Sequence, residues 1–380
     1  MLKVGIVGLP NVGKSTLFNA LLKKQIAYTA NYSFATIEPN VGVVEVPDGR
    51  LEKLADSTAS LPTLLKELRG TSQNDVRPPI VPAAVEFYDI AGLVRGAHKG
   101  EGLGNQFLSH IREVAVIVHV VRLFEDENII RVDSAKQGSV DDISIINEEL
   151  TFADLSTLQK QKEPKGNFSK AEKFNWDTYQ KVKNQLNNGV LVKDQNLTED
   201  EHEVVKPLNL LTIKPQIIVF NISENQLSDK KQTEEKIKKI LDDSKIKDEY
   251  IYLCVKLEND ILSLEDKDQM EYLSSFDLKE TGLEKLIKTS YKTLNLISFL
   301  TAGEKEVRAW TIKHGTDAQN AAGVIHSDFY DKFIRADIVT FDDFVSSNGW
   351  VKSKDLGKVR SVGKEYIMQD GDVVDFKIAP

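Results

Sequence analysis

The chain has 380 residues, of which 41% are hydrophobic and 28% charged, and its formal net charge is −9. This length exceeds that of one ordinary hydrophobic core and predicts two or three domains of a soluble globular protein. The acidic balance excludes a surface that coats nucleic acid throughout, so RNA contacts would have to come from local basic patches. The single cysteine, Cys254, excludes an intrachain disulfide and fits a reducing cytoplasm.

The N-terminus runs from Met1 straight into a strand-like segment, which is unlike a cleavable signal. The sequence also lacks any run of about 18 apolar residues, the length that a membrane-spanning helix needs. We therefore expect a cytoplasmic protein without membrane contact.

Short β-branched runs alternate with helical stretches, which is typical of a mostly parallel sheet with crossover helices. The expected strands are Lys3–Val7, Val41–Val46, Ala84–Tyr88, Val114–Val121, Gln216–Phe220 and Tyr250–Cys254. A polar stretch from about Ser144 to Lys206 interrupts this α/β domain, and its leucine spacing predicts an inserted helical hairpin broken near Pro164. A helix near Leu283–Leu296 follows. The last part of the chain predicts a small α+β domain with β-rich segments at Arg308–Ile312, Phe333–Val339 and Tyr366–Met368.

The segment from Gly8 to Ser15 reads Gly-Leu-Pro-Asn-Val-Gly-Lys-Ser and fits the phosphate-loop pattern G-x-x-x-x-G-K-S. It follows a predicted strand and opens a predicted helix, a context that a glycine-rich turn without a ligand does not require. The Lys14 ammonium would reach the β- and γ-phosphates and the Ser15 hydroxyl would bind Mg²⁺. The residues expected to bind the nucleotide phosphates are Asn11, Val12, Gly13, Lys14, Ser15 and Thr16.

A nucleotide switch also needs a metal ligand from a loop and an acidic group near the γ-phosphate. Thr36, between the first helix and the second strand, is the candidate loop ligand, although a lone threonine there could be a turn residue. Asp89 ends a predicted strand in Asp-Ile-Ala-Gly and would hold Mg²⁺ through water, while the Gly92 N–H would contact the γ-phosphate. The expected metal ligands are therefore Ser15, Thr36 and Asp89.

Leu93 stands where many GTPases carry a glutamine that orients the attacking water, and leucine offers no hydrogen bond. Asn11 could instead hold a K⁺ ion whose charge stabilises the transition state. His98 and Arg131 are further candidates for that role, and solvated surface positions would explain both of them as well. The predicted catalytic groups are Lys14, Asn11 and Gly92.

Base recognition is expected after the strand Gln216–Phe220, where guanine-specific proteins carry Asn-Lys-x-Asp. This chain has Asn221-Ile222-Ser223-Glu224, and the longer Glu224 would accept hydrogen bonds from guanine differently from an aspartate. The Asn221 amide can both accept from and donate to adenine, so guanine selection is weakened. A strand-end cap is the alternative role for Asn221. The predicted base-binding residues are Asn221, Ile222 and Glu224.

Several of these segments together resemble the YchF/Obg-like ATPase subfamily of the Obg-related P-loop proteins. They are Gly8–Thr16, Phe34–Asn40, Asp89–Phe107, Asn221–Glu224, Thr301–Ile312 and Gly323–Phe329. The resemblance implies a G domain (1–143 and 207–297), an inserted helical coiled-coil domain (144–206) and a TGS domain (298–380). It further implies preference for ATP over GTP, slow hydrolysis and ribosome association. Two features depart from it: Arg131 follows Asn128-Ile129-Ile130 where some relatives have histidine, and the stretch 63–79 is additional.

Two basic stretches offer surfaces for ribosomal RNA. Positions 160–183 contain seven lysines and three acidic residues, and the tail carries Lys352, Lys354, Lys358, Arg360 and Lys364. Solvated helix faces would also explain these charges. We expect a monomer that binds ATP, GTP more weakly, Mg²⁺ and the ribosome or its large subunit. The alternatives are a GTPase of the same fold and a nucleotide-gated RNA-binding scaffold with little hydrolysis.

Overall fold

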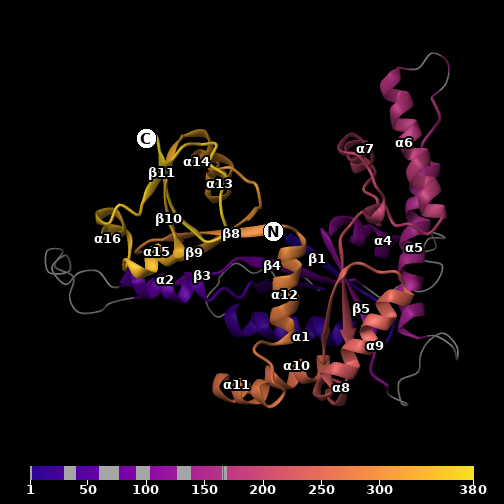
Figure 1. Ribbon diagram of the computed structural model, residues 1–380, viewed down its shortest axis with the longest axis horizontal. Helices are drawn as coiled ribbons and strands as arrows, with labels where there is room; N and C mark the ends of the chain where they lie inside the picture. The colour runs from indigo at the N-terminus through magenta and orange to yellow at the C-terminus, as the bar shows by residue number, and fades with distance from the viewer. Residues whose placement is uncertain are drawn as a thin grey trace. The chain divides into compact units, whose positions relative to one another are not determined.

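The computed structural model describes residues 2–29, 40–59, 77–90, 103–125, 138–164, 166 and 169–380. The chain forms two compact units (Figure 1). One consists of Met1–Val44 and Val85–Thr293, and the other of Glu45–Ala84 and Leu294–Pro380. Each unit therefore combines segments that are far apart in the sequence.

The first unit contains a six-stranded sheet in the order β2-β4-β1-β5-β6-β7. The strands are β1 (Leu2–Val7), β2 (Val41–Glu45), β4 (Ala84–Asp89), β5 (Val116–Arg122), β6 (Gln216–Asn221) and β7 (Glu249–Leu253). Neighbours from β4 to β7 pair in parallel. β2 is antiparallel to β4, because the Asp89 N–H donates to the Asn40 carbonyl while the Val46 N–H donates to the Ala83 carbonyl. The predicted mixed, mostly parallel sheet is confirmed.

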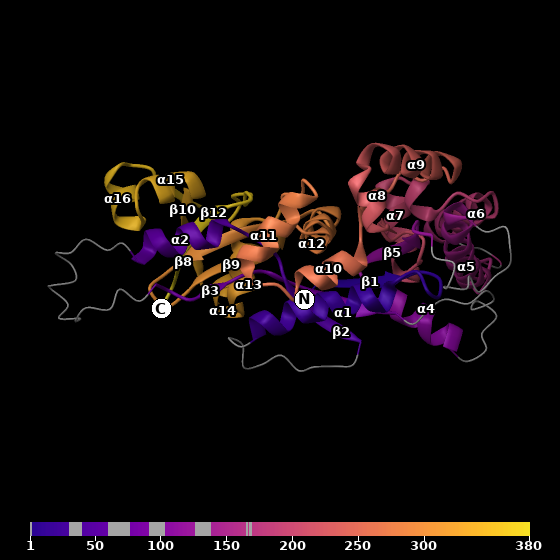
Figure 2. The ribbon, with the colours of Figure 1, turned by 90° about the horizontal axis from the view of Figure 1, so that it is seen from below.

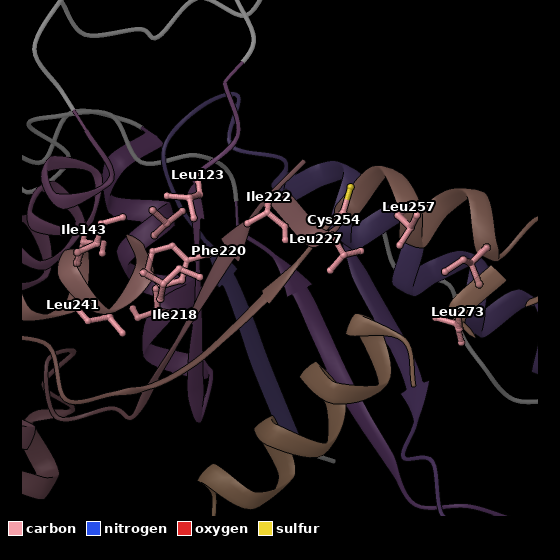
Figure 3. Packing of buried hydrophobic residues seen from close by; sticks show 14 residues of the cluster. Leu123, Ile143, Ile218, Phe220, Ile222, Leu227, Leu241, Cys254, Leu257 and Leu273 are labelled. Atoms are coloured by element: carbon pink, nitrogen blue, oxygen red, sulfur yellow. The ribbon is translucent and has the colours of Figure 1, made fainter. Parts of the chain in front are cut away.

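Helices cover this sheet and bury its central strands, of which every residue of β5 and β6 is buried. The helices are α1 (Lys14–Thr29), α4 (Leu103–Glu113), α5 (Ser139–Gln159), α8 (Glu224–Ser228), α9 (Lys230–Asp243), α10 (Val255–Ile261), α11 (Asp266–Ser275) and α12 (Gly282–Thr293). Phe220 of β6 packs in one core cluster with Leu241 of α9 and Leu257 of α10 (Figure 3). This cluster fixes the residues that flank the end of β6.

The helical insert shares its first helix with the sheet. The first half of α5 packs through Ile146 and Leu150 on the side of α4 and β1. Its last turn places Leu158 in a separate core with Val182 and Leu186 of α6 (Lys170–Asn187) and with residues near α7 (Glu199–Val205). Figure 1 shows α5 and α6 as two long helices, and they contact each other. The predicted hairpin is present, and the expected limit at residue 144 falls inside α5.

A buried carboxylate fixes the return of the insert to the sheet. Asp154 of α5 is fully buried, and it accepts hydrogen bonds from the Leu211 N–H at 2.7 Å and from the Thr212 N–H at 2.8 Å. The Thr212 hydroxyl donates to the same carboxylate at 2.7 Å. Burial raises the pKa of Asp154, and these donors oppose that rise.

The second unit contains another six-stranded sheet, in the order β11-β10-β12-β8-β9-β3. Its strands are β3 (Ile80–Val81), β8 (Leu296–Ala302), β9 (Val307–Lys313), β10 (Phe333–Thr340), β11 (Arg360–Val362) and β12 (Asp372–Ile378). Its helices are α2 (Arg50–Ala59), α13 (Ala318–Ile325), α14 (Ser327–Asp331), α15 (Phe341–Ser346) and α16 (Trp350–Asp355). Phe299, Ala322 and Phe376 belong to the core between sheet and helices. The predicted α+β character of this region is confirmed.

The chain between β2 and β4 belongs to this second unit, whereas the sequence placed it within the G-domain segment 1–143. Ile80 of β3 pairs with Val307 of β9, and α2 lies beside β8 and β9 (Figure 2). The Arg50 guanidinium donates to Asp48 and, across 320 positions of sequence, to Asp370. Partners this distant leave no local signal in the sequence.

The helix expected near Leu283–Leu296 is present as α12, although it ends at Thr293 and Leu296 begins β8, because an apolar run of this length fits a helix and a strand equally well. The β-rich segment expected at Tyr366–Met368 was wrong, since it contains only an isolated bridge from Ile367 to Asp317. Among the described residues, every helix is too short or too polar to cross a membrane.

Candidate nucleotide-binding site

The phosphate loop lies between the end of β1 and the first residue of α1. Gly8 and Gly13 have φ angles of +153° and +103°, which side-chain-bearing residues rarely adopt. A Cβ atom at Gly13 would lie 2.4 Å from the Asn221 amide nitrogen, and one at Gly8 would lie 2.5 Å from the Val120 carbonyl oxygen. Both glycines therefore let the loop curl closely against β5 and β6. The loop delivers the N–H groups of the first turn of α1 to one point, where an anion is stabilised.

Lys14 lies inside this loop. Its residue is 7% exposed, and its Nζ donates to the Leu9 carbonyl at 2.7 Å. Burial lowers the pKa of Lys14 to about 8, and the Asp89 carboxylate opposes this shift. A cation buried among backbone groups gains strongly from an incoming anion, so this position is suited to a phosphate.

Asp89 occupies the end of β4, in register with Ile6 of β1. Its Oδ1 atom is buried and accepts no hydrogen bond from the residues that the structure describes. A buried carboxylate oxygen without a donor is costly unless a cation or a water satisfies it. Ser15, at the start of α1, is exposed and offers a hydroxyl oxygen. Such hard oxygen ligands suit Mg²⁺, which keeps several waters and binds few protein groups, so these residues fit that ion.

Asn11 stands at the turn of the loop with a φ of +63° and an exposed side chain. Asparagine tolerates this left-handed conformation better than most residues, so the backbone alone accounts for its presence there. Thr16 is exposed on the first turn of α1, and Val12 is buried at 3% exposure. The role of Asn11 as a cation ligand remains a prediction.

Asn221 joins the phosphate loop to the segment after β7. Its Nδ2 donates to the Val12 carbonyl at 2.9 Å, and its Oδ1 accepts from the Val255 N–H at 3.2 Å. The residue is 5% exposed. An amide has two N–H bonds and two acceptor positions, so one of each is left for a base after these contacts. Asn221 therefore links the phosphate loop to the start of α10, and this structural role does not depend on base recognition.

Glu224 begins α8 and pairs with Lys256, the second residue of α10, at an Nζ–Oε1 distance of 3.1 Å. Ile222, two residues earlier, is 2% exposed, and its N–H donates to the Leu253 carbonyl at 3.0 Å. Ile222 thus anchors the segment through the core. The sequence gives no sign of this pair, because nothing in it reveals that two surface charges from separate segments will meet.

His119 lies in β5 beside Val7, the last residue before the phosphate loop. It is completely buried, and neither ring nitrogen has a partner within the described residues. Burial, aided by the positive charges of Lys14 and Lys193, lowers the pKa of His119 to about 3. Sequence analysis missed it, although a single histidine in the run Val-Ile-Val-His-Val-Val was a visible signal.

Comparisons with known proteins place this geometry in a family. Residues 3–148 match the MMR_HSR1 family model, described as "50S ribosome-binding GTPase", and residues 296–379 match YchF-GTPase_C, described as "Protein of unknown function (DUF933)". The ribosome-binding ATPase YchF of Bacillus subtilis is 45% identical over 99% of this chain and 99% of its own length. The protein of the same name from Escherichia coli O157:H7 is 44% identical over 98% of each chain.

The chain belongs to the YchF family. The solved structure of the Schizosaccharomyces pombe YchF GTPase agrees, with a TM-score of 0.85, 36% identity and coverage of 99% of this chain and 97% of that one. The resemblance drawn from the sequence motifs is therefore confirmed, and with it the P-loop fold class. Because both chains are covered almost fully, the insert and the second unit are part of the YchF architecture.

The structure brings most of the predicted YchF site residues together at one edge of the sheet. The phosphate loop follows β1, Asp89 ends the neighbouring β4, and Asn221 ends β6 and donates to the loop. Other predicted residues lie outside the described residues, so their places stay predictions. They are Thr36, Gly92, Leu93, His98 and Arg131.

The basic residues of this YchF chain differ in how far they are engaged. Lys181 of α6 pairs with Glu201 at 2.7 Å, and Lys358 pairs with Asp343 at 2.9 Å. Arg360 lies over the Tyr366 ring, 5.8 Å from its centroid. The exposed lysines of α6 and α16 are Lys170, Lys173, Lys352 and Lys354, where Lys352 lies one helical half-turn from Lys354. These four are better placed than Lys181 or Lys358 to meet a polyanion.

Proposed function

We propose that this chain is a P-loop NTPase, a slow Mg²⁺-dependent ATPase that binds the ribosome or its large subunit as a nucleotide-controlled switch. The observation that carries the proposal is the buried Lys14 inside the phosphate loop, next to a carboxylate oxygen of Asp89 that lacks a donor within the described residues. A buried cation at the start of α1 and an unsatisfied carboxylate at the end of β4 suit a triphosphate and its metal ion.

In this proposal Ser15, Thr36 and Asp89 hold Mg²⁺, and Asn11 adds a K⁺ ion. When bound, Mg²⁺ would neutralise charge on the β- and γ-phosphates. Lys14 binds the phosphate oxygens, the Gly92 N–H contacts the γ-phosphate, and the backbone from Asn11 to Thr16 surrounds the chain of phosphates. Leu93 offers the attacking water no hydrogen bond, which supports slow turnover in the isolated protein.

A GTPase of the same fold is the second candidate. The descriptions of the MMR_HSR1 model and of the S. pombe structure both contain the word GTPase, whereas the bacterial relatives are named ATPases. The segment Asn221–Glu224 favours ATP, because the Glu224 side chain is one methylene longer than that of an aspartate and its carboxylate is paired with Lys256. Hydrolysis of both nucleotides, measured side by side, distinguishes the candidates.

Ribosome binding is proposed from the names of the relatives and from the basic surfaces of this chain. Ribosomal RNA is the partner that these surfaces suit, because lysines bind phosphates and release their counterions. The exposed lysines of α6 lie in the insert, and those of α16 lie in the second unit. In this proposal the chain is a cytoplasmic monomer. It consists of a G domain, a helical insert at 144–206 and a TGS domain from residue 298.

Cosedimentation with ribosomes over a range of salt concentrations tests the partner. The parent chain should pellet with ribosomes and dissociate as salt rises. The slope of log affinity against log salt is negative. The double reversal Lys170→Glu with Lys173→Glu should make it shallower by roughly 1.4 to 1.8, since each lost phosphate contact contributes about 0.7 to 0.9. The reversal Lys352→Glu with Lys354→Glu tests the second unit in the same way.

Lys267→Glu with Lys279→Glu is the matched control, because it changes the net charge equally at exposed positions of another region. Hydrolysis should persist in all three double variants, since none of them alters the phosphate loop. If the parent chain fails to pellet with ribosomes, the proposed partner is wrong. If both test variants pellet like the control, the partner stands and the binding surface is wrong.

A further inference from the structure

Two helices that begin near Asn221 carry opposite charges, which form an ion pair. Glu224 is the first residue of α8 and Lys256 the second of α10. Both helices begin shortly after the end of a strand, and residues around both starts belong to one hydrophobic core (Figure 3). The exposed fraction is below 5% for Ile222, Leu227, Cys254 and Leu257. The backbone positions of the two charges are therefore set by packing, and only their side chains can move.

The ion pair leaves Glu224 partly accessible and Lys256 largely so. Nζ and Oε1 are 3.1 Å apart, and the side chains are 39% and 78% exposed for Glu224 and Lys256 respectively. Asn221, three residues before Glu224, contacts Val12 of the phosphate loop and the N–H of Val255. A nucleotide whose phosphates enter that loop would bring its base to the starts of these two helices.

Guanine and adenine make different demands on a carboxylate at this place. Guanine presents two donors, N1–H and N2–H₂, which bind side by side to the two oxygens of one carboxylate. Adenine presents an acceptor at N1 and a donor at N6, so it has no use for a second carboxylate oxygen. For Glu224 to bind guanine in this way, its Oε1 would have to leave the Lys256 ammonium or share its charge with it, whereas adenine makes no such demand.

We propose that Lys256 is a specificity-determining residue, which holds the Glu224 carboxylate in an ion pair and so disfavours guanine against adenine. This inference rests on the proposed nucleotide binding and assigns Lys256 a part in it that no sequence motif indicated. Because the pair is exposed, its expected effect is modest. We expect a change of about two- to fivefold in relative affinity, the range found for exposed ion pairs.

Four proteins test the proposal by titration calorimetry with Mg-ATP and Mg-GTP: the parent, Lys256→Ala, Glu224→Ala and the double variant. Lys256→Ala should raise the affinity for GTP about two- to fivefold and change that for ATP less than twofold. The gain should vanish in the double variant, because it requires the released Glu224 carboxylate. This cycle separates the pair from the individual side chains.

Lys292→Ala is the matched control. It breaks an ion pair with Glu249 in which the lysine is also 78% exposed, on α12 of the same unit. Its ratio of ATP to GTP affinity should equal that of the parent. A ratio unchanged in Lys256→Ala, or a gain for GTP that persists in the double variant, would overturn the inference while nucleotide binding stands. A parent that binds neither nucleotide would overturn the proposed function with it.

Discussion

The phosphate end and the base end of the proposed nucleotide site are built in different ways. The phosphate end is one uninterrupted segment, in which β1, the loop from Gly8 to Gly13 and the start of α1 follow each other. The base end is assembled from the segment Asn221–Glu224 and from Lys256, which belong to different helices and loops. Chemistry held within one segment can be recognised in a sequence, whereas chemistry that depends on two segments meeting appears only in the fold.

Loss of Lys14 should have the largest effect, and it should act on the phosphate end alone. Lys14→Ala removes the buried cation of the loop, and removal of one group that stabilises transition-state charge typically costs about 10² to 10³ in turnover. We expect ATP and GTP hydrolysis to fall together by at least 100-fold. Ser15→Ala should lower turnover as strongly, because it removes the proposed hydroxyl ligand of Mg²⁺. Lys23→Ala, an exposed lysine on the same helix, is the control and should hydrolyse normally in a phosphate-release assay.

Asn221→Ala sharpens the comparison, because this residue belongs to both ends. Its loss leaves the Val12 carbonyl and the Val255 N–H without their partner, at a cost of about 1 to 3 kcal/mol for buried groups. The free energy of unfolding should fall by that amount in urea titrations. The affinities for ATP and for GTP should weaken by the same factor as each other, and a loss of 1.4 kcal/mol of binding free energy corresponds to roughly tenfold. A loss confined to ATP would show that Asn221 acts on the base and not on the loop.

The pH dependence of nucleotide binding should report the buried Lys14. Its pKa in the free protein is lowered to about 8, and an anionic triphosphate would raise it. Lys14 is thus protonated below pH 8 and must take up a proton to bind phosphate above it. Affinity should therefore be constant below pH 7 and fall by up to about tenfold per pH unit above pH 8. Calorimetry in buffers of different ionisation enthalpy should detect proton uptake at pH 8.5, and its absence there would contradict the assignment.

The smallest expected effect is that of His119 on the pH dependence of stability. We expect this residue of the phosphate end to have a structural role. Its pKa is lowered to about 3, so the folded protein keeps the ring neutral while the unfolded chain protonates below pH 6.5. Stability from this group should fall by about 1 kcal/mol between pH 8 and pH 6. His119→Leu should remove that part of the pH dependence in urea titrations and retain hydrolysis. A variant that folds normally but loses turnover would instead indicate a catalytic role.

The same contrast explains what could be predicted from the sequence. The six strands of the first sheet follow from local β-branched runs, and Gly8, Lys14 and Asp89 follow from motifs with a fixed strand context. The transfer of residues 45–84 to the second unit could not be predicted, because Arg50 and Asp370 are 320 positions apart. The pairing of Glu224 with Lys256 likewise depends on where α8 and α10 begin.

The central claim is that a phosphate end common to P-loop proteins is combined here with a base end that selects adenine. Titration calorimetry of the parent chain with Mg-ATP and Mg-GTP, in the same buffer, tests it most directly. We predict that ATP binds at least several-fold more tightly than GTP, since Glu224 replaces the guanine-reading aspartate and is engaged by Lys256. Tighter binding of GTP would contradict the account and favour a GTPase.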